Sequence, residues 1–115
     1  MQPLRARAKE DRTAVPDVRA KLFALIKERS FRRGTIALVS GRASNFYFDM
    51  KPTMFDPAGA AWLAEMILDE LAAIEVDYVG GLAIGAVPLV SCVITLSHQR
   101  GRPIPGFFVR AQGFY

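Results

Sequence analysis

The chain has 115 residues, which is enough for one domain or part of one. Its composition, 51% hydrophobic and 23% charged, predicts a folded protein with a buried core and excludes an intrinsically disordered chain. The formal net charge is +4, and it arises in the first 33 residues, where ten Lys or Arg side chains stand against four acidic ones.

The N-terminal segment is basic, and we expect residues 1–15 to form a flexible tail ahead of a domain that spans residues 16–115. Such a tail can bind nucleic acid or a membrane surface, or it can simply be solvated. No aromatic side chain interleaves the charges before Phe23, so a stacking surface for single-stranded nucleic acid is not indicated. The segment also lacks the apolar core of a signal peptide. We therefore expect neither nucleic acid nor a membrane as a partner.

Hydrophobic periodicity and turn residues predict an alternation of helices and strands. The predicted elements are a helix over 16–30 with Gly34 after its end, strands over 35–40 and 46–50 paired as a hairpin, a helix over 57–74, a strand over 78–84, a helix over 87–99 and a strand over 104–110. Asp56 and Pro57 mark a helix start, because Asp accepts hydrogen bonds from free amides and Pro is tolerated in the first turn. This order predicts an α/β fold with a parallel sheet.

An apolar stretch over residues 78–99 contains no Lys, Arg, Asp or Glu and is long enough for a transmembrane helix. Three glycines near its start and Pro88 interrupt it. These residues favour a strand, a turn and a shorter helix over one long helix. We therefore predict that the stretch is part of the sheet and of its covering layer.

The single cysteine, Cys92, lies in this apolar stretch and cannot form an internal disulfide, which fits a reducing, cytoplasmic setting. The single histidine, His98, is six residues away and off the same helix face. Cys92 is therefore interpreted as a small buried hydrophobe and not as a nucleophile. The residues alone indicate no catalytic side chain and no metal site.

Three short blocks could bind a ligand. Residues 40–51 read Ser-Gly-Arg-Ala-Ser-Asn-Phe-Tyr-Phe-Asp-Met-Lys and combine a tight turn with three aromatic side chains. Residues 80–88 read Gly-Gly-Leu-Ala-Ile-Gly-Ala-Val-Pro, a strand end and turn that would direct backbone amides of a helix N-terminus at the sheet edge. They are not the dinucleotide fingerprint, because Leu82 stands where that motif requires glycine. Residues 106–110 end in Arg110, a cation well placed for phosphate.

Each block also has a simpler interpretation. Three aromatics in a strand often serve core packing and cross-strand pairing. Strand alternation puts Phe46 and Phe48 on one face and Tyr47 on the other, so a regular strand cannot direct all three into one pocket. The glycines could serve close packing only, and Arg110 could be an ordinary surface arginine.

Together and in this order, the three blocks closely resemble the N-terminal half of orotate phosphoribosyltransferase, over about residues 33–110. The resemblance implies a type I phosphoribosyltransferase fold, a parallel α/β sheet with a hood formed by the N-terminal helix and the hairpin. It implies a glycosyltransferase of pyrimidine (UMP) biosynthesis that transfers ribose 5-phosphate from phosphoribosyl pyrophosphate to orotate. The products are orotidine 5′-phosphate and pyrophosphate, and Mg²⁺ is carried by the donor. The resemblance implies a cytoplasmic homodimer in which each active site includes a loop from the neighbouring subunit.

The resemblance also assigns an orotate-binding role to five residues of the first block. The turn that forms one side of the orotate site corresponds to Ser40, Gly41 and Arg42. Tyr47 and Phe48 correspond to its stacking surface. These assignments follow from the family motif and not from the spacing itself.

The donor side is assigned in the same way. Gly85 and Ala86 align with the turn that approaches the pyrophosphate, and Arg110 aligns with the arginine that opens the family's pyrophosphate-binding loop. The acidic, Thr/Gly-rich loop that binds the ribose phosphate has no counterpart in these residues, so the domain is expected to be partial and not to catalyse the transfer alone. The alternatives are a non-catalytic pyrimidine-binding or dimerisation module, or nucleic-acid binding through residues 5–33. A sheet ended after its second parallel strand would expose an edge and self-associate.

Overall fold

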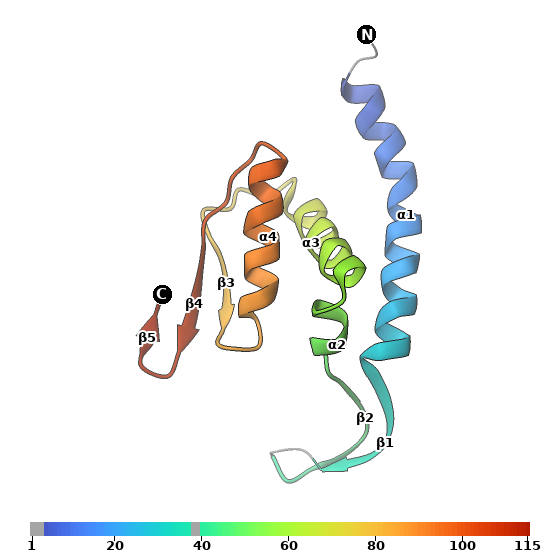
Figure 1. Cartoon of the computed structure of the whole chain (residues 1–115), viewed down its shortest axis with the longest axis vertical. Helices are drawn as coiled ribbons and strands as arrows, with labels where there is room; N and C mark the ends of the chain where they lie inside the picture. The colour runs from blue at the N-terminus through green and yellow to red at the C-terminus, as the bar shows by residue number, and fades with distance from the viewer. Residues whose placement is uncertain (1–3, 38–39) are drawn as a thin grey trace.

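The computed structural model describes residues 4–37 and 40–115, with the side chains of residues 17–34, 40–113 and 115. The helices are α1 (Leu4–Arg29), α2 (Lys51–Met54), α3 (Pro57–Leu71) and α4 (Val87–Gln99). The strands are β1 (Phe31–Ala37), β2 (Ala43–Phe48), β3 (Val79–Leu82), β4 (Gly106–Arg110) and β5 (Gly113–Phe114). In Figure 1, α3 and α4 lie side by side, with α1 beyond α3 and the strands β3, β4 and β5 beyond α4. Helices packed beside parallel strands confirm the predicted α/β class.

Helix α1 is longer than the sequence pattern predicted. The predicted helix began at Pro16, whereas α1 begins at Leu4 and ends at Arg29. Residues 4–15 contain no glycine or proline and include Ala, Arg, Lys and Leu, which favour helix. Figure 1 shows these first turns extending past the other elements. Most of the expected tail is therefore helical in its backbone, and its independence from the domain stays a prediction.

Strands β1 and β2 form the predicted antiparallel hairpin, although both begin earlier than the pattern indicated. The register pairs Phe31 with Phe48 and Arg33 with Phe46, and it shifts directly after Arg33. Gly34, which was expected just beyond the first helix, instead lies inside β1 at this irregularity. A bulge lets the strand continue through a glycine that local propensity would assign to a turn.

Strands β3 and β4 are parallel, as predicted, and their register pairs Leu82 with Val109. A short strand that the pattern did not predict, β5, pairs antiparallel with the other edge of β4. There, Phe108 and Tyr115 exchange two backbone hydrogen bonds of 2.6 and 2.7 Å. The edge of β4 that we expected to be open is therefore paired with the last residues of the chain, and self-association through the sheet stays a prediction.

The core lies between α3, α4 and the segment that leads into β4. Its buried hydrophobic residues are Ala64, Leu68, Val93 and Ile104. Ile67 and Leu71 pack against them from α3. The core thus joins α3 and α4 to each other and to the start of β4, and it holds the sheet edge in place relative to the helices.

The apolar stretch over residues 78–99 is divided as predicted. It contributes β3, a turn and α4, which begins at Val87 with Pro88 in its first turn. Within residues 4–37 and 40–115, no helix is both long enough and apolar enough to cross a membrane.

Replacing Ser97 with alanine is expected to destabilise the contact between α4 and the entry to β4. The Ser97 hydroxyl is 1% exposed, donates to the Ile94 carbonyl at 2.7 Å and accepts from the Ile104 amide at 2.9 Å. Ser97→Ala leaves that amide buried without a partner, and we expect a loss of about 1 kcal/mol in the free energy of unfolding, measured in urea. The matched control is Ser91→Ala, an exposed serine of the same helix, and equal effects of the two variants would contradict the prediction.

Candidate functional site

The predicted site residues occupy two regions of the fold. One region is the turn between β3 and α4 together with the end of β4, and the other is the β1–β2 hairpin. Figure 1 shows β3 and β4 running downward beside α4, whereas the hairpin extends below α1 and α2. The structure therefore places the predicted residues in two separate regions, the hairpin next to α1 and α2 and the sheet edge next to α4.

The β3–α4 turn carries Gly85 and Ala86. The turn is closed by two backbone hydrogen bonds, from the Ala86 amide to the Leu82 carbonyl and from the Val87 amide to the Ile84 carbonyl, both 3.0 Å long. A Cβ added at Gly85 would meet nothing within 4 Å, so its backbone borders open space. The 13-residue helix α4 begins directly after this turn and directs the positive end of its dipole toward it.

Arg110 lies at the same sheet edge as this turn. Leu82 pairs with Val109, and the Ala83 amide donates to the Val109 carbonyl at 2.8 Å, so the next residue of each strand reaches the same edge. The Arg110 guanidinium lies over the Tyr115 ring, 5.6 Å from its centroid. The edge thus combines a cation with the start of a helix, an arrangement that suits an anion.

The turn of the hairpin carries Ser40, Gly41 and Arg42, and all three are exposed. Gly41 has φ = 84°, a conformation that side-chain-bearing residues rarely adopt, which explains why glycine stands at this position. Exposure of the turn leaves the hydroxyl of Ser40 and the guanidinium of Arg42 accessible to a ligand from solvent.

The hairpin has two chemically different faces, as strand alternation predicted. Phe46 and Phe48 lie on one face with Phe31, with ring centroids between 5.2 and 6.1 Å apart. Tyr47 lies on the other face, opposite Arg32 in the register. Phe48 is 56% exposed and Tyr47 39% exposed, so both rings are accessible. The structure does not bring Tyr47 and Phe48 together on one face, and one ring-shaped ligand cannot stack on both within this hairpin.

The phenylalanine face borders an open cavity of about 270 Å³. Its lining residues are Phe31, Arg33, Asn45, Phe46 and Phe48. The guanidinium of Arg33 lies over the Phe31 ring, 5.6 Å from its centroid. The sequence pattern did not mark Arg33 as a site residue, because it placed the first strand after Gly34. Extending that strand back to Phe31 would have put Arg33 opposite Phe46.

A buried junction at the base of the hairpin sets its position relative to the helices. The hydroxyls of Ser30 and Thr53 share a hydrogen bond of 2.6 Å, and both residues are fully buried. The Asp49 amide donates to the Ser30 carbonyl at 2.9 Å, and the Arg29 guanidinium pairs with the Asp56 carboxylate at 3.1 Å. The end of α1, the end of β2, α2 and the start of α3 therefore meet at one point.

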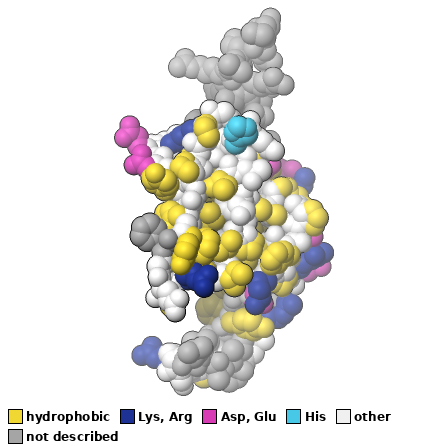
Figure 2. All heavy atoms as spheres, turned by 60° about the vertical axis from the view of Figure 1, so that its left-hand side comes forward, with side chains coloured by type: hydrophobic (Ala, Val, Ile, Leu, Met, Phe, Trp, Pro, Cys, Tyr) yellow, Lys and Arg dark blue, Asp and Glu magenta, His cyan; other side chains and the backbone are white. Residues whose placement is uncertain are grey.

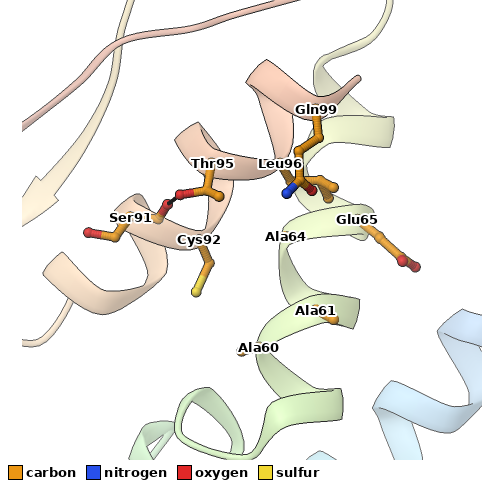
Figure 3. Close-up of a pocket in the computed structure, with 9 residues that line it drawn as sticks. All are labelled: Ala60, Ala61, Ala64, Glu65, Ser91, Cys92, Thr95, Leu96 and Gln99. Atoms are coloured by element: carbon orange, nitrogen blue, oxygen red, sulfur yellow. Dashed lines mark hydrogen bonds between the residues drawn. The ribbon is translucent and has the colours of Figure 1, made fainter. Parts of the chain in front are cut away.

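A further cavity of about 330 Å³ lies between α3 and α4, apart from the predicted residues (Figure 3). Ala60, Ala61, Ala64 and Glu65 line it from α3, and Ser91, Cys92, Thr95, Leu96 and Gln99 line it from α4. The Thr95 hydroxyl donates to the Ser91 carbonyl of its own helix at 2.7 Å. The cavity is largely apolar, and none of the predicted ligand-binding residues lines it.

Hydrophobic side chains gather on the side of the molecule that Figure 2 brings forward, the side of the strands. Tyr78, Leu82 and Ile84, which belong to or flank β3, are among the exposed large hydrophobic residues. Within the described part of the chain, no group of three or more His, Cys, Asp or Glu side chains is arranged to hold a metal ion.

The chain is similar to known proteins in both sequence and structure, although no protein-family model matches it. The orotate phosphoribosyltransferase of Rhodopseudomonas palustris strain TIE-1 is 55% identical over 92 residues, which are 80% of this chain and 49% of that protein. The solved orotate phosphoribosyltransferase of Mycobacterium tuberculosis H37Rv with inorganic phosphate has a TM-score of 0.70 at 29% identity and covers 86% of this chain and 57% of its own. The same protein with 5-phospho-α-D-ribosyl 1-diphosphate has a TM-score of 0.67 at 30% identity, covering 85% and 56%.

These comparisons confirm the family resemblance and the fold that it implied. The chain spans about half the length of the curated relatives it matches. Sequence identity of this level over 92 residues, together with the shared arrangement of helices and strands, leaves one conclusion. The chain is a homologue of orotate phosphoribosyltransferase with a type I phosphoribosyltransferase fold, and it corresponds to about half of such a protein.

Proposed function

We propose that this chain supplies the orotate-binding surface, and part of the surface for phosphoribosyl pyrophosphate, in an orotate phosphoribosyltransferase of pyrimidine biosynthesis. The observation that carries the proposal is the 55% identity to a relative of that name. The reaction breaks the bond between C1 of the ribose and the pyrophosphate and forms a bond from C1 to a ring nitrogen of orotate, which loses its proton to solvent. It yields orotidine 5′-phosphate and pyrophosphate.

Gly85, Ala86 and Arg110 are the proposed donor-binding residues. They share one sheet edge, where the start of α4 and a guanidinium favour the negative charge of a pyrophosphate group. The tuberculosis structures with inorganic phosphate and with 5-phospho-α-D-ribosyl 1-diphosphate support a phosphate-bearing ligand for this fold. We propose that Mg²⁺ would be carried by the oxygens of the donor, where it would neutralise charge on the leaving pyrophosphate.

Ser40, Gly41, Arg42, Tyr47 and Phe48 are the proposed orotate-binding residues. The exposed turn offers a hydroxyl and a guanidinium, and the strand that follows offers aromatic rings. Because Tyr47 and Phe48 project from opposite faces, we propose that one of them stacks on the pyrimidine while the other supports the hairpin.

Assembly and setting are also part of the proposal. A homodimer is proposed because the family resemblance implies that each site is completed by a loop of a neighbouring subunit. A reducing, cytoplasmic setting fits the single unpaired Cys92. We assign no catalytic side chain within these residues, and binding without turnover is expected of the chain alone.

Orotate binding by the purified chain tests the proposal. We expect saturable binding in equilibrium dialysis, and we expect the double substitution of Tyr47 and Phe48 by alanine to weaken it by about tenfold, since stacking on an aromatic side chain contributes about 1–3 kcal/mol. Phe55→Ala, which removes an exposed ring outside the hairpin, is the matched control.

A second assay separates an enzyme from a binding module. Adding phosphoribosyl pyrophosphate and Mg²⁺ and following orotate absorbance measures transfer directly. Turnover would assign transferase activity to these 115 residues, whereas binding alone favours the pyrimidine-binding module. Absence of orotate binding by the folded chain would contradict both.

A further inference from the structure

The cavity on the phenylalanine face of the hairpin contains Phe48, a proposed orotate-binding residue, and four residues to which the family motif assigns no role. Two of its five lining residues are polar, Arg33 and Asn45, and the other three are phenylalanines. Phe46 and Phe48 are exposed and stand nearly perpendicular, with an angle of 81° between their rings. The cavity therefore offers flat apolar walls of a size that suits one planar ring.

The charge of Arg33 narrows the class of ligand. Its side chain is exposed and lies over the Phe31 ring, and it forms no ion pair within the part of the chain that the structure describes. A guanidinium next to an apolar wall attracts a carboxylate more strongly than one fully surrounded by water, because the local dielectric is lower. Asn45 adds an amide that can donate to and accept from the polar edge of a ring. The lining thus complements a planar ring that carries a negative charge.

We infer that Arg33 is a positioning residue for a planar aromatic carboxylate, with the ring held against Phe46 and Phe48 and its polar edge against Asn45. The identity of that carboxylate as orotate rests on the proposed function. On this basis the phenylalanine face, and not the Tyr47 face, receives the ligand, and the carboxylate of orotate is the group that separates it from uncharged pyrimidines.

The neighbouring arginine provides a matched control. Arg32 is also exposed but lies on the opposite face of β1, opposite Tyr47, where its guanidinium donates to the Glu28 and Phe31 carbonyls at 3.4 and 3.3 Å. Arg33→Gln and Arg32→Gln therefore remove the same charge from adjacent positions on the two faces. Both side chains are exposed, so neither substitution is expected to disturb folding.

Binding of three probes to the parent chain and the two variants tests the inference. The probes are orotate, uracil, which has the ring without the carboxylate, and benzoate, which has a ring and a carboxylate without the pyrimidine groups. We expect Arg33→Gln to raise the Kd for orotate by about tenfold or more, since a charge-assisted pair to a carboxylate is lost. Arg32→Gln should leave it unchanged, and uracil should bind weakly and equally to all three proteins.

The outcomes separate this inference from the proposed function. Equal orotate binding by Arg33→Gln and the parent would overturn the inference and leave orotate binding in place. A larger loss in Arg32→Gln would overturn it by placing the ligand on the Tyr47 face. Binding of benzoate but not orotate, with loss in Arg33→Gln, would support the site and contradict the proposed function. Binding of neither carboxylate by the folded parent would overturn the inference.

Discussion

Gly59→Ala is expected to lower the free energy of unfolding by about 2 kcal/mol, although alanine is the better helix former. Gly59 is buried in the first turn of α3, where its amide donates to the Asp56 carboxylate at 2.9 Å. An added Cβ would overlap the Thr53 carbonyl oxygen, which is backbone and cannot turn away, and would lie 3.0 Å from Leu25 Cδ2. The steric cost of the added methyl group, about 3 kcal/mol, exceeds the gain of about 1 kcal/mol from the higher helix propensity of alanine, which leaves a net loss of about 2 kcal/mol.

The matched control for this prediction is Gly85→Ala. A Cβ at Gly85 would meet nothing within 4 Å, and its φ is not in the left-handed region, so no backbone or side-chain group needs to move. Urea unfolding of the two variants measures the difference directly. A Gly59→Ala protein as stable as the parent would show that α2 and α3 can move apart without loss of stability. That result would contradict the close contact between Gly59 and Thr53.

Thr53→Val is expected to destabilise the same junction by about 2 kcal/mol. Valine keeps the shape of threonine but removes the hydroxyl that shares a 2.6 Å hydrogen bond with Ser30. Because both residues are 0% exposed, the Ser30 hydroxyl would be left without a partner and without water. The exposed Thr95→Val is the control, and we expect it to change stability by less than about 0.5 kcal/mol.

A double-mutant cycle shows whether this effect belongs to the pair. Ser30→Ala alone leaves the Thr53 hydroxyl buried and unpaired, whereas the combination with Thr53→Val removes both polar groups together. The loss in the free energy of unfolding of the double variant should therefore be smaller than the sum of the losses in the two single variants, by about 1 kcal/mol or more. Strict additivity would contradict a hydrogen bond between the two hydroxyls.

Both predictions concern the junction between the hairpin and the helices. This junction affects the proposed site because it sets the position of the hairpin. The hairpin has only two strands, and an isolated two-stranded hairpin is marginal in water. Its attachment through Ser30, Asp49 and the α2–α3 segment sets where its rings lie relative to the sheet edge. A variant that loosens the junction should therefore weaken orotate binding together with stability, even though none of its residues lines the cavity.

Several features of the fold could be predicted because they depend on local chemistry. Asp56 was predicted to begin a helix, and its carboxylate accepts from the Gly59 amide at the start of α3. The helix predicted over 87–99 has the same bounds in α4, because Pro88 and the residues before Gly101 mark both of its ends. The alternation of Phe46, Tyr47 and Phe48 likewise predicted the two faces of β2.

Other features could not be predicted because they depend on contacts between distant residues. The bulge that carries β1 through Gly34 exists only because β2 pairs with both sides of it. Strand β5 forms where the last residues meet β4, and two residues carry too little pattern to indicate a strand. The Ser30–Thr53 pair joins positions 23 residues apart that no local signal connects.

The sequence by itself determined the α/β class, the order of the longer helices and strands and the family resemblance, since these follow from periodicity, turn residues and three short motifs. The tertiary structure alone decided which side chains share a surface. It separated Tyr47 from Phe48, placed Arg110 beside the β3–α4 turn, and put Arg33 into a cavity with three phenylalanines. The physical reason is that register and burial arise from pairing between segments, and a residue's own neighbours in the chain do not specify the strand it will face.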